Sequence, residues 1–250
     1  MIFETKNVAV IKLLKSVEKR KVKDFEREFS FLKALQNSSI SPAAYSFRIK
    51  ENYVYFSQEF VEGLSLPQFT RRKKRSPKKL VLSIAGKIAE AFKEIHLRNI
   101  VHGDIHPSNI IVTSGNTIKI IDFGLALNTE LDKDELVNFG GAYFFMPPER
   151  IRKTTFNKFT HKPDFYSDVF QIGIVLFMLL YNEYPFNGIT WEELASEVKE
   201  KQIAFPEVSH FNFLIPKWLK DVIEKCVAKK AKQRFSTAAE LYHAFQKSLK

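Results

Sequence analysis

Three polar side chains have the types and spacing that phosphoryl transfer requires. Asp104 is followed five residues later by Asn109, and Asp122 comes after an apolar run and directly before a Phe-Gly pair. In phosphoryl transfer from ATP, one carboxylate accepts the proton of the attacking hydroxyl, and oxygen ligands hold the magnesium ions that neutralise the phosphates. The apolar stretches 110–112 and 118–121 separate the three groups, which is not the pattern of a solvated surface. The spacing therefore predicts a metal-assisted phosphotransfer site.

The elements that would position these residues change character along the chain. Strand signals occur first, with one helix among them, and helical patterns dominate after Gly63. The predicted strands are 8–14, 44–50 and 53–61, with a hairpin turn at Glu51-Asn52 and a helix from about Lys23 to Leu35; the later helices are predicted at 80–97, 168–181, 191–201, 216–228 and 236–249. This order predicts an α+β fold with a small strand-rich lobe (1–62), a larger helical lobe (63–250) and a nucleotide held between them.

Six segments in a fixed order resemble the motifs of the eukaryotic-type protein kinases. HGDIHPSN (102–109) is similar to the family's catalytic loop, and DFG (122–124) to its magnesium-binding motif. The other similar segments are VAVIK (8–12), REFSFLKAL (27–35), PPE (147–149) and the start of a buried helix at Asp168, together with Arg234 near the end of the chain. The resemblance covers nearly the whole chain and implies ATP and Mg²⁺ as cofactors and a protein as substrate.

The resemblance assigns a role to each polar residue of the site. Asp104 would deprotonate the substrate hydroxyl, and Asn109 and Asp122 would ligate magnesium. Lys12 would hold the inner phosphates, fixed in place by Glu28. Glu28 is favoured over Glu26 for this pairing because Phe31, Leu32 and Leu35 then share one helical face.

The same resemblance predicts the surroundings of the adenine. Val10 would cover the base and Ile111 would lie beneath it. The backbone from Glu59 to Val61 would hydrogen-bond its edge, with Gln58 bordering the inner pocket.

Other matched residues are expected to have structural roles. Asp168 would hydrogen-bond the backbone of the catalytic loop, and Glu149 would pair with Arg234. His102 and Phe123 would pack together rather than take part in the chemistry.

Four departures from the family pattern bear on activity. No glycine precedes Val8, so the glycine-rich phosphate loop is missing from this sequence, which predicts either a start assigned too late or an open site with weak ATP affinity. Gly103 replaces the catalytic-loop arginine, which disfavours switching by activation-loop phosphorylation. His106 stands where the family has a lysine that meets the transferred phosphate, and histidine is only partly charged at neutral pH. Ala142 replaces a threonine.

Composition limits the possible classes of protein. A chain of 250 residues that is 45% hydrophobic can bury a large core. The single cysteine, Cys226, excludes an internal disulfide and is expected to be a buried apolar residue. No apolar run is long enough to span a membrane, and no signal-peptide pattern begins the sequence. We therefore expect a cytoplasmic protein, or one exported without a cleaved signal.

The formal net charge of +11 is concentrated in two runs, 71–79 and 149–162. A solvated charge run is the default interpretation of both. The second run would lie beside the substrate groove of a kinase, which leads to the hypothesis that Arg152, Lys153, Lys158 and Lys162 favour an acidic substrate, an acidic partner or an anionic membrane. Nucleic-acid binding is disfavoured because no basic helix with interleaved aromatic residues occurs.

Three functions are compatible with these residues. An ATP- and magnesium-dependent serine/threonine protein kinase is favoured. A kinase-like scaffold with weak or no catalysis is the second possibility, supported by the missing loop, His106 and Ala142. The third is a small-molecule kinase, because the HGDxHP pattern also resembles aminoglycoside and choline kinases.

Overall fold

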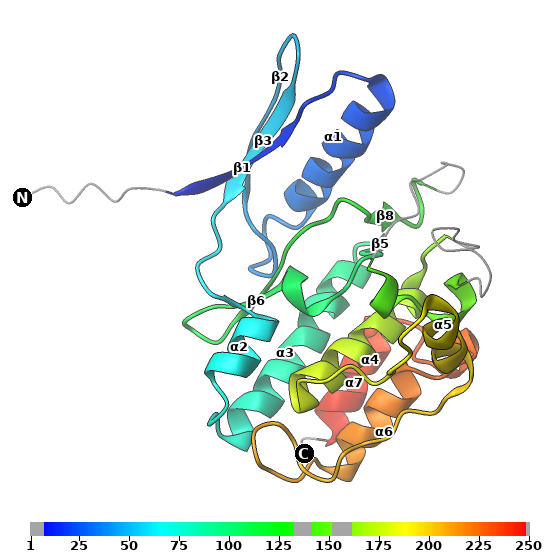
Figure 1. The fold of residues 1–250 in the computed structure, drawn as a ribbon. Helices are drawn as coiled ribbons and strands as arrows, with labels where there is room; N and C mark the ends of the chain where they lie inside the picture. Colours follow the sequence, from blue (N-terminus) through cyan, green and yellow to red (C-terminus); the bar gives the residue numbers. More distant parts are fainter. Residues whose placement is uncertain (1–7, 133–141, 152–161, 249–250) are drawn as a thin grey trace, which may run out of the picture.

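Residues 8–132, 142–151 and 162–248 are described by the structure, a computed structural model, and they form two lobes (Figure 1). The smaller lobe contains a three-stranded sheet and one helix, whereas the larger lobe is mostly helical. The predicted α+β class and two-lobed arrangement are therefore confirmed.

The sheet of the small lobe is antiparallel and is ordered β1-β3-β2. Its strands are β1 (Ala9–Leu14), β2 (Ala44–Ile49) and β3 (Val54–Glu59). The Lys50 N–H donates to the Tyr53 carbonyl at 2.9 Å, which closes the predicted hairpin turn. In β1 exposed and half-buried side chains alternate, as expected for an edge strand with one covered face.

Helix α1 (Lys19–Ala34) packs on this sheet through aromatic side chains. The ring of Phe25 lies 4.7 Å from that of Phe56, and the ring of Phe29 lies 5.5 Å from that of Phe47. The helix begins four residues before the predicted Lys23, because the segment between contains no glycine or proline that would break it. Its apolar face fixes the rotation of the helix and so the direction in which Glu28 points.

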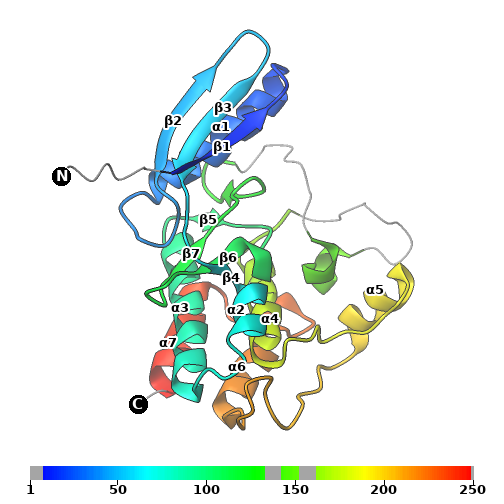
Figure 2. The same ribbon diagram turned by 60° about the vertical axis from the view of Figure 1, so that its left-hand side comes forward.

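The larger lobe surrounds one buried helix, α4, with other helices and short strand pairs. In Figure 2, β4, β6 and β7 lie between the small lobe and helices α2 and α3. The helices are α2 (Leu66–Arg72), α3 (Lys78–His96), α4 (Phe165–Tyr181), α5 (Trp191–Glu200), α6 (Lys217–Cys226) and α7 (Ala238–Ser248). The strands are β4 (Leu64–Ser65), β5 (Ile100–Val101), β6 (Ile110–Val112), β7 (Ile118–Ile120) and β8 (Leu127–Asn128). The 3₁₀ turns among the described residues are η1 (Pro107–Asn109), η2 (Tyr143–Phe145), η3 (Pro148–Arg150) and η4 (Ala231–Gln233).

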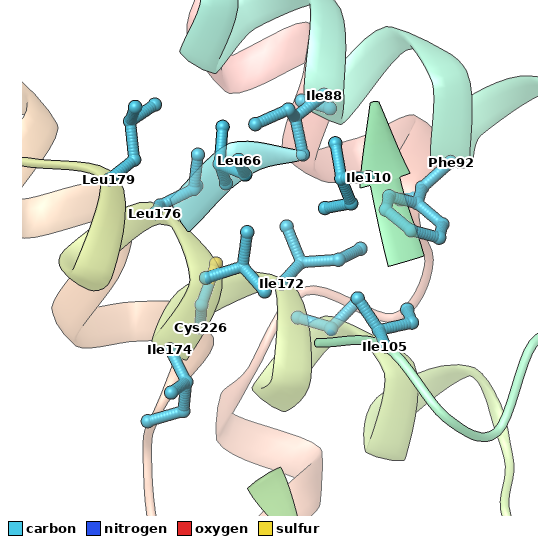
Figure 3. Close-up of a cluster of buried hydrophobic side chains, with 14 of the residues drawn as sticks. Leu66, Ile88, Phe92, Ile105, Ile110, Ile172, Ile174, Leu176, Leu179 and Cys226 are labelled. Carbon is cyan, nitrogen blue, oxygen red and sulfur yellow. The ribbon is translucent and has the colours of Figure 1, made fainter. Parts of the chain in front are cut away.

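Helix α4 is mostly apolar and is buried on every side, and its few polar residues, which include Asp168 and Gln171, are buried with it. Asp164 begins it by accepting the Ser167 N–H at 2.8 Å, and Asn182 ends it in the left-handed region at φ 54°. The predicted start at Asp168 is therefore three residues late. Figure 3 shows Ile172 of α4 packed among side chains of other elements, including Ile105 and Ile110. These two isoleucines flank the segment 106–109, so the core holds both ends of the predicted catalytic loop.

Cys226 is fully buried in α6, as the sequence predicted. Gly173 of α4 lies directly against it, because a Cβ at position 173 would be only 2.6 Å from the Cys226 Cβ. Within the described ranges, no helix is long and apolar enough to cross a membrane.

Candidate active site

Lys12 connects the two lobes through two carboxylates. Its ammonium group forms an ion pair with Glu28 of α1 and a second one, at 3.0 Å, with Asp122 Oδ1. The Glu28 side chain is buried at 8% exposure, while that of Asp122 is 50% exposed. The predicted preference for Glu28 over Glu26 is thus confirmed as a contact. One cation therefore joins β1, α1 and the segment that follows β7.

The charges of this triplet act on one another. Burial alone would lower the pKa of Lys12, but the two carboxylates outweigh it and raise the pKa above its usual value. Burial of Asp122 is likewise outweighed by the Lys12 ammonium, so the pKa of Asp122 is lowered. Burial raises the pKa of Glu28, because the shared lysine only partly offsets the loss of water. The half-exposed Asp122 is therefore an anion at neutral pH.

Side chains of α4 hydrogen-bond the backbone of residues 102–105. Asp168, which is fully buried, accepts the N–H of His102 at 2.7 Å and that of Gly103 at 2.9 Å. Gln171 Oε1, one helical turn later, accepts the Ile105 N–H at 3.0 Å. Helix α4 therefore fixes the backbone on both sides of Asp104.

Gly103 is required by the local geometry of this loop. Its φ is +76°, a region that residues with a Cβ rarely adopt. A Cβ at this position would also lie 2.8 Å from the Leu125 carbonyl oxygen. The loop as folded here has no space for a side chain at position 103.

Asp104 is held by its neighbours at both its carboxylate and its carbonyl. Its Oδ1 accepts the Ala142 N–H at 2.8 Å, and its backbone carbonyl accepts from Asn109 Nδ2 at 3.1 Å. His106 Nε2 lies 3.8 Å from Asp104 Oδ2. The three predicted residues of the catalytic loop are thus brought together, and Asp104 and His106 remain partly exposed at 21% and 22%.

The β6–β7 hairpin brings Asn109 close to Asp122. Asn109 directly precedes β6, and the Ile121 N–H, which follows β7, donates to the Asn109 carbonyl at 2.9 Å. Asp122 is the next residue and adopts a positive φ of 66°, which Asp tolerates better than most residues. The two predicted metal ligands therefore come from the same end of one hairpin.

The donor set of this pair suits magnesium. Asn109 uses its Nδ2 to bond Asp104, so its Oδ1 is the remaining acceptor. Asp122 uses Oδ1 for Lys12, and no hydrogen bond from a described residue reaches its Oδ2. Magnesium binds through one or two protein oxygens together with substrate phosphates. The described residues include no cluster of three or more His, Cys, Asp or Glu that could hold a metal ion.

The residues predicted to surround adenine lie on the facing elements of the two lobes. Val10 is half-buried in β1 opposite Gln58 of β3, and Ile111 is half-buried in β6. Val61 lies in the connection between the lobes, which passes close to β6, because a Cβ at Gly63 would be 2.7 Å from Ile111 Cγ2. The Ile111 side chain therefore packs against the connection at Gly63.

The side chain of Glu59, at the end of β3, binds groups of the protein itself. Its Oε2 accepts from Lys119 Nζ at 2.6 Å and from the Ala43 N–H at 3.0 Å. Its backbone N–H donates to the Ala43 carbonyl. Its backbone N–H is therefore already paired and is not available to a ligand.

An ion pair predicted from the sequence fixes the segment after the site. Arg234 donates from Nη1 and Nη2 to the two carboxylate oxygens of Glu149 at 2.8 and 2.7 Å. His102 and Phe123 are both buried, with ring centroids 5.0 Å apart, as expected for packing residues.

Three residues of the site were not predicted. Gln171 bonds the catalytic loop directly, and His96 Nε2 lies 3.1 Å from the Asp168 carboxylate. Arg150 is 1% exposed, and its burial lowers the pKa of its guanidinium group. Nearby carboxylates, most strongly that of Asp168, partly offset this lowering. The available signal for Gln171 was a polar residue in a helical segment whose other residues are mostly apolar. No sequence signal marks Arg150, because arginines are usually exposed.

The basic run 149–162 lies mostly outside the described residues. Arg152, Lys153 and Lys158 belong to that part, so their predicted role beside a substrate groove stays a prediction. Lys162 is described, and its ammonium donates to the Asp132 carbonyl.

Comparison with known proteins agrees with these motifs. A family model described as protein kinase domain matches residues 2–246. A probable serine/threonine-protein kinase of Clostridium perfringens is 29% identical over 95% of this chain, and the serine/threonine-protein kinase PrkC of Bacillus subtilis is 29% identical over 88%. The dual specificity protein kinase TTK of Mus musculus is 29% identical over 97% of the chain.

The matched region is only part of each relative. The alignments cover 34%, 33% and 29% of those three proteins, so the chain spans about a third of their length. The names also differ in specificity, since two are serine/threonine kinases and one is a dual specificity kinase. The comparisons therefore establish the type of domain and leave its acceptor hydroxyl open.

Proposed function

Because the chain belongs to the protein kinase family, we propose that it transfers the terminal phosphoryl group of ATP to serine or threonine hydroxyls of a protein. The observation that carries this proposal is the contact of Lys12 with both Glu28 and Asp122. That contact joins the cation of the small lobe that we propose to bind phosphate to the carboxylate of the larger lobe that we propose to bind magnesium. We also propose that the lobes divide at residues 1–62 and 63–250.

In this proposal each residue acts from the position already described. Asp104, fixed through the backbone of residues 102–105, accepts the proton of the substrate hydroxyl. Lys12 neutralises the inner phosphates, and His106, beside Asp104, contacts the transferred phosphate when protonated. Asn109 and Asp122 would hold magnesium, which would neutralise charge on the phosphates.

The nucleotide base would be held between the lobes. Val10 and Ile111 supply apolar contacts from opposite sides. The backbone from Glu59 to Val61 supplies hydrogen bonds to the adenine edge. The charged Glu59 side chain is tied to Lys119 and takes no part.

A transfer assay with radiolabelled ATP and magnesium tests this function. Generic basic and acidic proteins and aminoglycosides serve as acceptors. We expect labelled protein, with phosphoserine or phosphothreonine after hydrolysis. Asp104→Asn should reduce the rate by about 10²–10⁴-fold, the usual contribution of a general base, while ATP affinity changes little. Lys12→Met should weaken both binding and transfer.

Matched controls are Asp221→Asn and Lys217→Met, which alter an exposed ion pair of α6. Both should retain the wild-type rate. Transfer that survives Asp104→Asn would refute the assigned base. Label found on aminoglycoside alone would favour a small-molecule kinase, and ATP binding without any transfer would favour a non-catalytic scaffold.

A further inference from the structure

The end of α2, the start of α3 and the connection between them carry a dense positive charge that the proposed phosphotransfer site does not use. Seven of the nine residues 71–79, here named the basic loop, are Arg or Lys, and all seven are exposed. Within the part of the chain that the structure describes, none of the seven forms an ion pair. Their charge therefore faces solvent uncompensated, unlike that of Lys201 or Lys217, which have acidic partners one helical turn away.

The basic loop has a defined shape. The Lys73 N–H donates to the Phe69 carbonyl and the Ser76 N–H to the Lys73 carbonyl, at 2.9 and 2.8 Å, and Ser76 is buried. Residues 72–76 line a hollow of about 410 Å³. Figures 1 and 2 both place the α2–α3 connection at the end of the helical lobe that is farthest from the sheet. A ligand there would lie away from the small lobe.

Apolar side chains lie next to these cations. The loop 208–214 packs beside the basic loop, with the ring of Phe211 6.4 Å from that of Phe69 in α2. The Lys78 ammonium lies 5.9 Å from the centroid of the Phe213 ring. The next residue, Leu214, is 63% exposed. One end of the molecule therefore presents a group of cations, and an exposed leucine directly follows the aromatic residue that Lys78 contacts.

We propose that the basic loop and Leu214 form a docking surface for a membrane that contains anionic phospholipids. Lipid phosphates would meet the cations, and Leu214 would enter the interface between headgroups and acyl chains. The hollow is lined by five consecutive residues, which suits a compact headgroup better than an extended acidic peptide. An acidic peptide also gives no role to an exposed leucine.

The size of the effect follows from the number of charges. A Lys or Arg near an anionic surface strengthens binding by about five-fold. Neutralising Arg72, Lys73, Lys74 and Arg75 should therefore weaken binding by up to about 600-fold at low salt, and by less as salt screens the field. Leu214→Ser should weaken it by about ten-fold, because an inserted leucine would lose its apolar contact.

The test is co-sedimentation of the full chain with phosphatidylcholine vesicles, with and without about 30 mol% phosphatidylserine, in about 0.1 M and 0.5 M salt. We expect binding only to the anionic vesicles, weaker at high salt, and lost when Arg72, Lys73, Lys74 and Arg75 are changed to Gln. The matched control changes four exposed cations of the small lobe, Lys15, Lys19, Arg48 and Lys50, to Gln. It should bind as the wild type does. Circular dichroism checks that both variants are folded.

Several results would overturn the proposal. Equal binding to neutral vesicles would remove the electrostatic basis, and equal weakening by the two quadruple variants would show only a net-charge effect. Wild-type binding by Leu214→Ser would remove the apolar contact. Capture of a polyglutamate peptide in preference to anionic vesicles would assign the surface to an acidic polypeptide instead.

Discussion

Replacing Asp168 by asparagine tests whether α4 supports the catalytic loop as the geometry implies. Asp168 accepts three donors: the N–H groups of His102 and Gly103, and His96 Nε2. His96 Nδ1 accepts the Ala238 N–H at 2.9 Å, so Nε2 carries the ring hydrogen and donates. Asparagine has nearly the same volume, but its NH₂ group replaces one carboxylate oxygen. That NH₂ group is a donor, and it would face a backbone N–H or the His96 ring N–H, which are also donors.

The cost can be worked from these bonds. A hydrogen bond to a charged group contributes about 1.5–3 kcal/mol, and a buried donor left without a partner costs about 1–3 kcal/mol. Losing one or two of the three bonds therefore lowers the free energy of unfolding by about 2–5 kcal/mol. Since domains are stable by only about 5–15 kcal/mol, the variant should fold but be markedly weakened.

Urea unfolding followed by circular dichroism measures this loss. With an m value of about 3 kcal/mol/M, a loss of 3 kcal/mol moves the midpoint by about 1 M. The control is Asp164→Asn, four residues earlier, where asparagine can still cap α4 by accepting the Ser167 N–H. It should cost less than about 0.5 kcal/mol. Equal urea midpoints for Asp168→Asn and Asp164→Asn would refute the inference that Asp168 holds the loop backbone in place.

Three further predictions concern packing and charge. Gly173→Ala should destabilise by about 1–2 kcal/mol in the same urea assay, because its clash with Cys226 outweighs a helix-propensity gain of about 1 kcal/mol. Gly86→Ala, with no neighbour within 4 Å, should stabilise by about 0.5–1 kcal/mol, and a shift of the same sign in both would contradict the packing. The buried Cys226 thiol, whose pKa is raised, should react with a thiol reagent at about pH 8 only after denaturation; equal native and denatured rates would contradict its burial. The pKa of Lys12 is raised above 10.5, so the stability that this residue contributes is fully present below that pH and is lost as pH rises through the folded-state pKa. The difference in free energy of unfolding between wild type and Lys12→Met should therefore shrink above about pH 10.5. A difference that stays constant with pH would contradict the raised pKa.

Periodic patterns in the sequence predicted much of the fold. The apolar face of α1 was enough to choose Glu28 over Glu26, because a helix rotated to expose Glu28 would expose Leu32 as well. Helix α2 was missed. It has only seven residues, includes Pro67 and ends in the basic loop, so it shows no apolar stripe long enough to detect. The helix is stabilised by tertiary packing, because Leu66 and Phe69 are buried against the rest of the lobe.

Resemblance supplied the contacts that no local pattern contains. Residues 149 and 234 are 85 positions apart, so their ion pair follows from the family's motifs and not from spacing. Contacts that belong to no motif were missed. His96 lies 72 positions from Asp168, and it was predicted only as part of an amphipathic helix. The sequence alone contains no signal for such a pair.

The buried charges beneath the catalytic loop explain why this part of the site depends on the whole fold. The Asp168 carboxylate is out of contact with water, so its charge must be balanced by nearby donors and cations. The loop backbone and His96 supply donors, while Arg150, itself buried, is drawn toward Asp168 and further carboxylates that include Asp104. These groups come from α3, η3, α4 and the catalytic loop, and they can balance one another only when all four are packed together. The position of Asp104 is therefore set by the folding of the helical lobe, and a substitution that loosens that lobe should displace this proposed base before the lobe unfolds.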